Sequence, residues 1–149
     1  MTSIQQQEVA DIKKSAKLIV EVLKDTRDIQ KNVNFYLKSK NDYIKQEYNL
    51  LRKELATILI DINLLDSNET QLEKLTQLEV IKSTLIANDL SNTGKIDALI
   101  REDKIKATMA TSLINDSATV YSIQKKLVEM ASMLFLNNNL LKEIGDTQK

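Results

Sequence analysis

Cysteine, histidine, proline and tryptophan are absent from this chain of 149 residues, and glycine occurs only twice. Without cysteine the chain forms no disulfide and has no thiol chemistry, and without histidine it lacks the commonest metal ligand and acid–base catalyst. Without proline, and with glycine only at Gly94 and Gly145, few residues interrupt helices, while good helix formers dominate. The sequence therefore predicts an all-α protein.

An excess of charge is also missing, because 21 basic side chains balance 21 acidic ones. This balance gives no sequence-wide reason to expect nucleic acid or an anionic surface as a partner. The longest apolar run, residues 55–65, is interrupted by polar residues and is shorter than the roughly 20 residues of a spanning helix. The first residues lack the features of a signal peptide. We therefore expect no nucleic-acid partner, no direct membrane insertion and a cytoplasmic location.

Four long amphipathic segments are predicted, at residues 3–37, 42–65, 70–90 and 105–144. The first begins with a capping box at Ser3 and Gln6, and the third with one at Thr70 and Glu73. Residues 91–94 are expected to interrupt the helical pattern, with one short extra helical turn after them, and Gly145 to end the last helix. Short connections favour antiparallel neighbours. We therefore predict one domain over residues 1–149, an antiparallel up-down bundle of four main helices with one short extra helical turn.

Apolar residues at three- and four-residue spacing predict which face of each segment is buried. On the first segment this stripe is Val9, Ile12, Ala16, Ile19, Leu23, Thr26, Val33 and Leu37. On the second and fourth segments, the residues expected in the core include Leu51, Leu55, Ile58, Leu113, Ile123 and Leu127.

One carboxylate falls on the apolar stripe of the last segment. Asp116 occupies a stripe position within the polar stretch that also contains Thr111, Ser112 and Asn115. A carboxylate that faces a core is costly unless a partner pairs with it. These four residues therefore mark either a structural hydrogen-bond network or a site that contacts a ligand or partner, and the sequence leaves both interpretations open.

The first segment offers polar residues that could pair with this carboxylate. Lys31, Asn32 and Tyr36 are polar residues on a helical segment, and two polar segments in one bundle most economically satisfy each other. We predict that Asp116 is buried and accepts a hydrogen bond from one of these three side chains, so that the two segments form one polar layer.

Two stretches resemble a known family. Residues 22–37, with the polar and aromatic residues that follow them, and residues 94–101 leading into 109–117 resemble the cytoplasmic C-terminal region of bacterial sodium/phosphate cotransporter family proteins. The resemblance covers most of residues 18–60 and 94–136, whereas residues 67–93 match only as a generic helix. It implies a PhoU-like helical domain without the membrane part. Such a domain would regulate or scaffold sodium-dependent phosphate transport at the cytoplasmic face of the inner membrane, with the membrane transporter part as its protein partner.

The resemblance also raises the question of metal binding, because PhoU-like proteins often carry acidic-x-x-x-Asp motifs that gather metal ions. Glu21 and Asp25 have this spacing, which places both carboxylates on one helical face. No second good copy of the motif occurs, and a hard cation usually needs more oxygen ligands than one pair supplies. The alternative is a solvated face on which nearby lysines pair with these carboxylates. We expect no cofactor, with a divalent cation at Glu21 and Asp25 as the competing interpretation.

The side chains that remain for chemistry are carboxylates, hydroxyls and lysines, and no nucleophile–base pair is recognisable among them. We therefore predict a non-catalytic regulatory or interaction domain. The alternative is a structural helical bundle that acts through homo-oligomerisation. A homodimer is expected because the first and last segments carry apolar residues beyond a single stripe, namely Leu18, Val22, Ile114, Val128 and Phe135.

Overall fold

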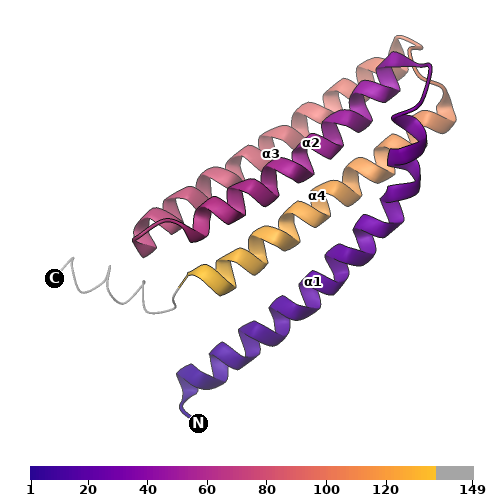
Figure 1. The fold of residues 1–149 in the computed structure, drawn as a ribbon. Helices are drawn as coiled ribbons and strands as arrows, with labels where there is room; N and C mark the ends of the chain where they lie inside the picture. Colours follow the sequence, from indigo (N-terminus) through magenta and orange to yellow (C-terminus); the bar gives the residue numbers. More distant parts are fainter. Residues whose placement is uncertain (137–149) are drawn as a thin grey trace.

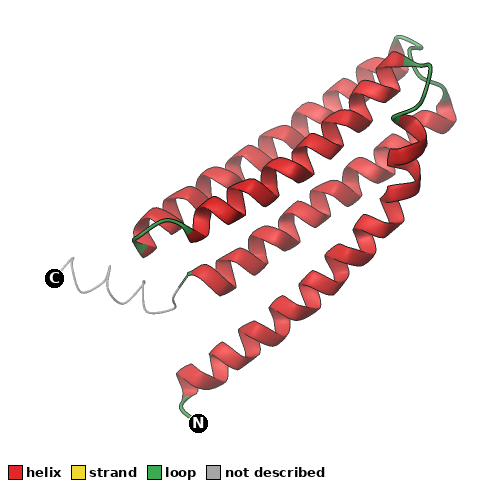
Figure 2. Ribbon diagram, viewed as in Figure 1, coloured by secondary structure: helices red, strands yellow, loops and turns green. Residues whose placement is uncertain are grey.

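The computed structural model describes residues 1–136 and contains four helices within them, α1 (Ser3–Tyr36), α2 (Asp42–Asp66), α3 (Gln71–Arg101) and α4 (Ala107–Phe135) (Figure 1). Within this range the chain forms no strand (Figure 2). Successive helices run up and down, so the predicted all-α antiparallel bundle is confirmed. None of the described helices combines the length and the apolarity needed to span a bilayer. The last helix ends at Phe135, followed by Leu136 in an extended conformation, so the predicted uninterrupted helix is wrong at Leu136. The predicted helix over residues 137–144 and its stop at Gly145 lie outside the described residues.

Helix α4 is the centre of the bundle. It contacts all three other helices, most extensively α1, whereas α1 contacts α2 far less. In Figure 1, α4 accordingly lies between α1 and the α2–α3 pair. The largest fully buried side chains come from α2, α3 and α4, and they are Ile44, Tyr48, Leu65, Leu78, Leu113, Val120 and Ile123.

Side-chain caps begin α1, α2 and α3, whereas Lys106 precedes α4 without a side-chain cap. A capping box begins α1 at Thr2 and Gln5, one residue before the predicted pair, and the predicted box at Thr70 and Glu73 is confirmed. Asn41 caps α2 by accepting hydrogen bonds from two backbone N–H groups of its first turn. Its Nδ2 also donates to the carbonyl of Lys104, at 2.9 Å. Asn41 therefore ties the α1–α2 connection to the α3–α4 connection.

The predicted interruption at residues 91–94, and with it the short extra helical turn, is wrong. Helix α3 runs through this stretch without a break. Asn92 lies seven residues, or two helical turns, after the buried Leu85 and four before the buried Ile96, and its Nδ2 donates to Glu54 Oε1 of α2 at 2.7 Å. Burial raises the pKa of Glu54, and the hydrogen bond from Asn92 opposes that shift. Residues 91–94 thus have the composition of a turn, although Asn92 among them is hydrogen-bonded on the packed face of a helix.

A residue in the left-handed backbone conformation lies just after the end of α3. Asp103 has a φ of 54°, and the backbone N–H of Lys104 donates to the carbonyl of Leu99 at 2.9 Å. Together with the bond from Asp103 N–H to the carbonyl of Ile100, this is the Schellman arrangement, which satisfies carbonyls that the last turn of a helix leaves free. Aspartate tolerates this backbone conformation better than most residues.

On α1 the predicted buried face is wrong for the N-terminal two-thirds of the helix. The buried residues of α1 are Ser15, Leu18, Ile29 and Tyr36. The predicted stripe is exposed at Val9, Ile12, Ala16, Ile19, Leu23 and Thr26, and only Val33 and Leu37 are half-buried. In the other helices the core prediction is confirmed for every named residue except Leu55, which is only half-buried.

Gly94 provides a test of the uninterrupted α3. It lies within the helix, is exposed, and a Cβ added there would meet nothing within 4 Å. We therefore expect Gly94→Ala to raise the free energy of unfolding by about 0.5–1 kcal/mol, because alanine loses less backbone entropy in a helix. Chemical denaturation would measure this gain. Ala87→Gly, at an exposed position of the same helix, should lower stability by a similar amount, and no gain at Gly94 would contradict a continuous α3.

Candidate functional site

The carboxylate of Asp116 is buried in the interior of the bundle and is satisfied by two helices. The residue is 6% exposed. Its Oδ2 accepts a hydrogen bond from Tyr48 OH of α2 at 2.6 Å and one from Asn32 Nδ2 of α1 at 2.9 Å. The prediction that Asp116 is buried and bonded to Asn32 of the first segment is therefore confirmed, and Tyr48 is an additional partner.

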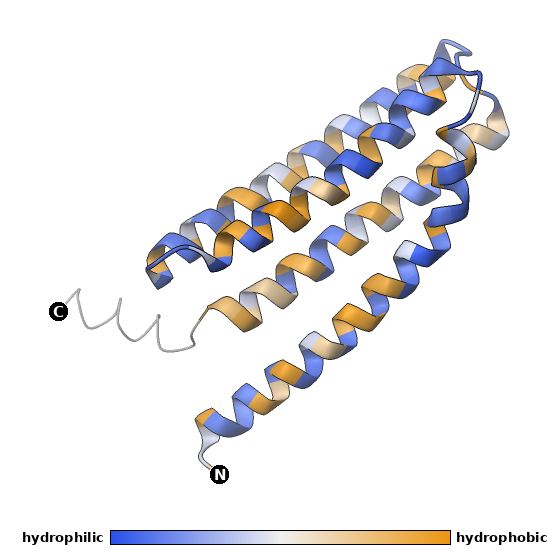
Figure 3. Cartoon of the chain, in the orientation of Figure 1, coloured by the Kyte–Doolittle hydropathy of each residue, from blue (hydrophilic) through white to orange (hydrophobic). Residues whose placement is uncertain are grey.

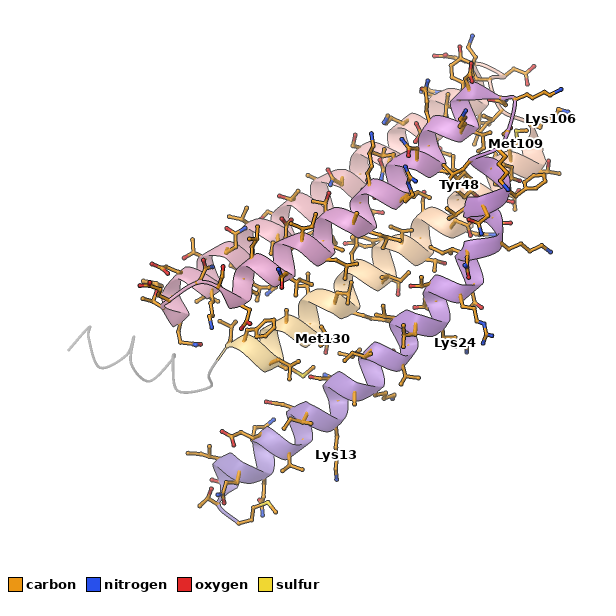
Figure 4. All side chains as sticks on the ribbon, viewed as in Figure 1. Lys13, Lys24, Tyr48, Lys106, Met109 and Met130 are labelled. Carbon is orange, nitrogen blue, oxygen red and sulfur yellow. The ribbon has the colours of Figure 1, made fainter. Side chains whose placement is uncertain are left out.

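Two further side chains extend this arrangement. The ring of Tyr36 stacks on that of Tyr48, with centroids 4.7 Å apart, and Tyr36 OH donates to Ser112 Oγ at 3.3 Å. We call Asn32, Tyr36, Tyr48, Ser112 and Asp116 the polar layer. In Figure 4, Tyr48 lies near the end of the bundle where two interhelical connections meet. The polar layer thus joins α1, α2 and α4 at that end.

Electrostatics fix the direction of the shortest bond in the polar layer. Burial, and then the hydrogen bond to Asp116, raise the pKa of Tyr48. The phenol therefore stays protonated at neutral pH and acts as a donor. Because Tyr48 is fully buried, this hydroxyl would otherwise have no water to bond with.

Three predicted site residues lie outside the polar layer. Lys31, Thr111 and Asn115 are exposed. Thr111 Oγ1 donates to the carbonyl of Ala107 within its own helix, at 3.0 Å. The predicted site therefore divides into residues that bond the helices together in the polar layer and residues whose side chains are exposed.

Glu21 and Asp25 do lie on one face of α1, and a lysine lies between them. Lys126 Nζ of α4 is 2.6 Å from Asp25 Oδ2 and 3.7 Å from Glu21 Oε2. The hydrogen bond to Asp25 raises the pKa of Lys126, so the ammonium stays charged. The partner is a lysine of another helix rather than the neighbouring lysines of α1. Among residues 1–136 no group of three or more acidic, histidine or cysteine side chains is arranged to hold a metal ion.

Tyr48 and Lys126 are the site residues that the sequence prediction missed. Tyr48 lies on the apolar stripe of the second segment, and a buried tyrosine needs a hydrogen-bond partner for its hydroxyl. This position is the sequence signal that could have identified Tyr48. Lys126 gives no comparable indication, because a lysine beside an apolar stripe is ordinary on an amphipathic helix.

Two surface hollows lie away from the polar layer. Their volumes are about 680 and 660 Å³, and no residue of the polar layer lines either. Comparison with known family models, curated proteins and solved structures finds no match for this chain. The resemblance to the sodium/phosphate cotransporter family therefore stays a prediction.

Removing the carboxylate of the polar layer should destabilise the fold. Asp116→Ala leaves the buried hydroxyl of Tyr48 and the amide of Asn32 without an acceptor, so we expect a loss of about 1–3 kcal/mol in denaturant melts. Combining Asp116→Leu with Tyr48→Phe removes the acceptor together with its fully buried donor and leaves only the half-buried amide of Asn32 without a partner, so it should recover much of that loss. Asp28→Ala, at an exposed position of α1, is the control and should change stability by less than about 0.5 kcal/mol. Equal effects of Asp116→Ala and Asp28→Ala would show that the polar layer contributes no stability.

The Lys126 interaction makes a separate prediction. Lys126→Ala leaves two carboxylates on the packed face of α1 without their cation, and we expect a loss of about 1–2 kcal/mol, reduced by the partial exposure of all three groups. Lys24→Ala, an exposed lysine of α1, should be nearly neutral. Calorimetric titration of the unmodified chain with Mn²⁺ should show no binding heat, because the ammonium already lies between the carboxylates. A saturable heat would favour the metal interpretation instead.

Proposed function

We propose that this chain is a non-catalytic interaction module that binds another protein through the outer face of α1. The observation that carries the proposal is a continuous row of exposed aliphatic side chains. We call it the outer stripe of α1, and it consists of Val9, Ile12, Ala16, Ile19, Val20 and Leu23. Exposure of its large members ranges from 41% at Val9 to 65% at Leu23.

The spacing of the outer stripe separates it from ordinary surface hydrophobics. Single exposed apolar residues need no explanation. Here five of the six residues recur at alternating three- and four-residue steps, which is the pattern of a helix that packs against another helix. The packed face of α1 is already used against α4, and against α2 near Tyr36, so the outer stripe is a second apolar face that no helix among the described residues covers. Figure 3 shows hydrophobic positions recurring along the N-terminal half of α1.

The absence of catalysis is part of the proposal. Tyr48, whose pKa is raised by burial, donates its hydroxyl hydrogen to Asp116 inside the bundle, and neither residue lines the hollows of about 680 and 660 Å³. Such a closed pair is suited to fixing helix register. The resemblance to PhoU-like cytoplasmic regions supplies the context, which is regulation of sodium-dependent phosphate transport at the cytoplasmic face of a membrane, with the transporter's membrane part as partner.

The second candidate is a structural bundle that works through association with copies of itself. It is favoured by the same outer stripe, because a heptad-like stripe can pack against an identical one. The two candidates differ in which protein covers α1.

Site-specific photocrosslinking in cells tests the proposed function. A photoreactive phenylalanine derivative at Val20, in the outer stripe, should form covalent adducts with a protein partner on irradiation. If the partner is a phosphate transporter, mass spectrometry of the adduct will identify its membrane part. The same derivative at Leu90, an exposed position of α3, is the matched control and should give no specific adduct. An absence of adducts from Val20, or adducts equal in kind and amount from both positions, would contradict an interaction surface on α1.

A further inference from the structure

We infer that the occupant of the outer stripe is the outer stripe of a second copy of this chain, with the two α1 helices packed antiparallel. The inference rests on the interaction surface of the proposed function, and it names as the occupant of that surface the partner of the second candidate, a copy of the same chain. The observation behind it is that the two faces of α1 are the reverse of what the sequence predicts. The residues with the clearest coiled-coil spacing are exposed, while the face packed on α4 includes Ser15 and the half-buried Asp11, Asp25 and Asn32.

The outer stripe is complementary to itself in the antiparallel direction. When Ala16 of one copy lies opposite Ile19 of the other, the same alignment places Ile12 opposite Leu23. Each small residue then faces a large one, and the two-fold symmetry repeats both pairs. In a parallel pairing Ala16 would face Ala16 and leave a void in the middle of the interface, which is costly. Side-chain volume therefore favours the antiparallel arrangement.

Charge along the outer stripe is compatible with this pairing. One flank of the stripe is basic, and its exposed members are Lys13, Lys17, Lys24, Arg27 and Lys31. Figure 4 shows Lys13 and Lys24 pointing away from α4. In the antiparallel alignment Lys13 is level with Val22 of the second copy, Lys17 with Leu18 and Lys24 with Asp11. Basic residues therefore do not face each other directly across the pair.

The same charges argue against an anionic lipid surface as the occupant. A helix that lies on such a surface carries basic residues on its polar face and is drawn to the membrane by them. Here the basic residues border only one side of the outer stripe, and the other side is bordered by the carboxylate of Glu8 and then by the packed face that includes Asp11. A second α1, which the outer stripe matches in spacing and volume, fits this asymmetric surface better.

The size of the outer stripe sets the expected strength. Residues 9–23 span about 22 Å of helix at 1.5 Å per residue. An interface of one helix face of this length lies at the low end of specific interfaces, which corresponds to weak, reversible association. We therefore expect a dimer with a dissociation constant in the range of about 1–100 µM.

Sedimentation equilibrium of the full chain across this concentration range is the primary test. The unmodified chain should reach the dimer mass. Ile19→Glu, which puts a carboxylate in the middle of the outer stripe, should weaken association by about 100-fold or more. Leu90→Glu on α3 is the matched control, since it also replaces an exposed aliphatic residue, and should leave the dissociation constant unchanged within about threefold. Circular dichroism would verify that both variants remain helical.

Disulfide trapping tests the direction of the pairing, and the lack of native cysteine makes it clean. An equimolar mixture of Ile12→Cys and Leu23→Cys chains, one of them carrying an affinity tag, should form mainly the mixed disulfide on mild oxidation. Predominant linkage of Ile12→Cys chains to each other would indicate a parallel pair and overturn the antiparallel arrangement.

Three other results would overturn the inference. One is a monomer throughout the concentration range, and another is a dimer that Ile19→Glu and Leu90→Glu weaken equally. The third is monomeric chain that binds phosphatidylglycerol vesicles and loses this binding with Ile19→Glu, which would assign the outer stripe to lipid. A monomer that still crosslinks through Val20 to a different protein would overturn only the dimer and leave the proposed function standing.

Discussion

One buried carboxylate, that of Asp116, needs hydrogen-bond donors, and this need constrains how α1, α2 and α4 align at one end of the bundle. Asp116 lies on α4 and is buried in the interior of the bundle. Its carboxylate accepts hydrogen bonds from one side chain of α1 and one of α2. A shift of either helix by one turn would remove a donor from reach. The stacked tyrosines then fill the space beside the carboxylate. The register of three helices therefore depends on a single hydrogen-bonded group, while apolar packing supplies most of the stability without fixing so exact an alignment.

Much of the fold follows from local pattern, because a helix needs little information from outside itself. The start of α2 at Asp42, the capping box at Thr70 and the stripes of α2 and α4 are all properties of neighbouring residues. The continuity of α3 was not predictable in this way. Asn92 is compatible with a helix only because Glu54 on another helix accepts its hydrogen bond, and nothing in the residues around Asn92 encodes that partner. Composition alone therefore made residues 91–94 resemble a turn.

The candidate site also has one part that could be predicted from the sequence and one part that could not. Burial of Asp116 and its bond to Asn32 could be predicted, because a polar residue on an apolar stripe requires a partner and few polar segments could supply one. Lys126 could not, since it is 101 residues from Asp25 along the chain and resembles any lysine on a helix surface. The face of α1 was misassigned because its strongest apolar stripe is not the one that α4 covers. Sequence periodicity identifies faces suited to packing but does not say which of two such faces the same chain will cover.

The link that Asn41 makes between two connections has a mechanical consequence for α1. At that end, the cap of α2, the α3–α4 connection and the polar layer are joined, so the last turns of α1 are held by several helices at once. Toward the N-terminus only Ser15 and Leu18 are buried among the first 20 residues of the chain, and an exposed ion pair joins Lys14 to Glu129 of α4. Local opening needs least free energy where few buried contacts must separate. Amide hydrogens along α1 should therefore form a gradient of protection against solvent exchange, slow near Tyr36 and fast near Ser3, so that one helix contains both the firmest and the loosest part of the bundle.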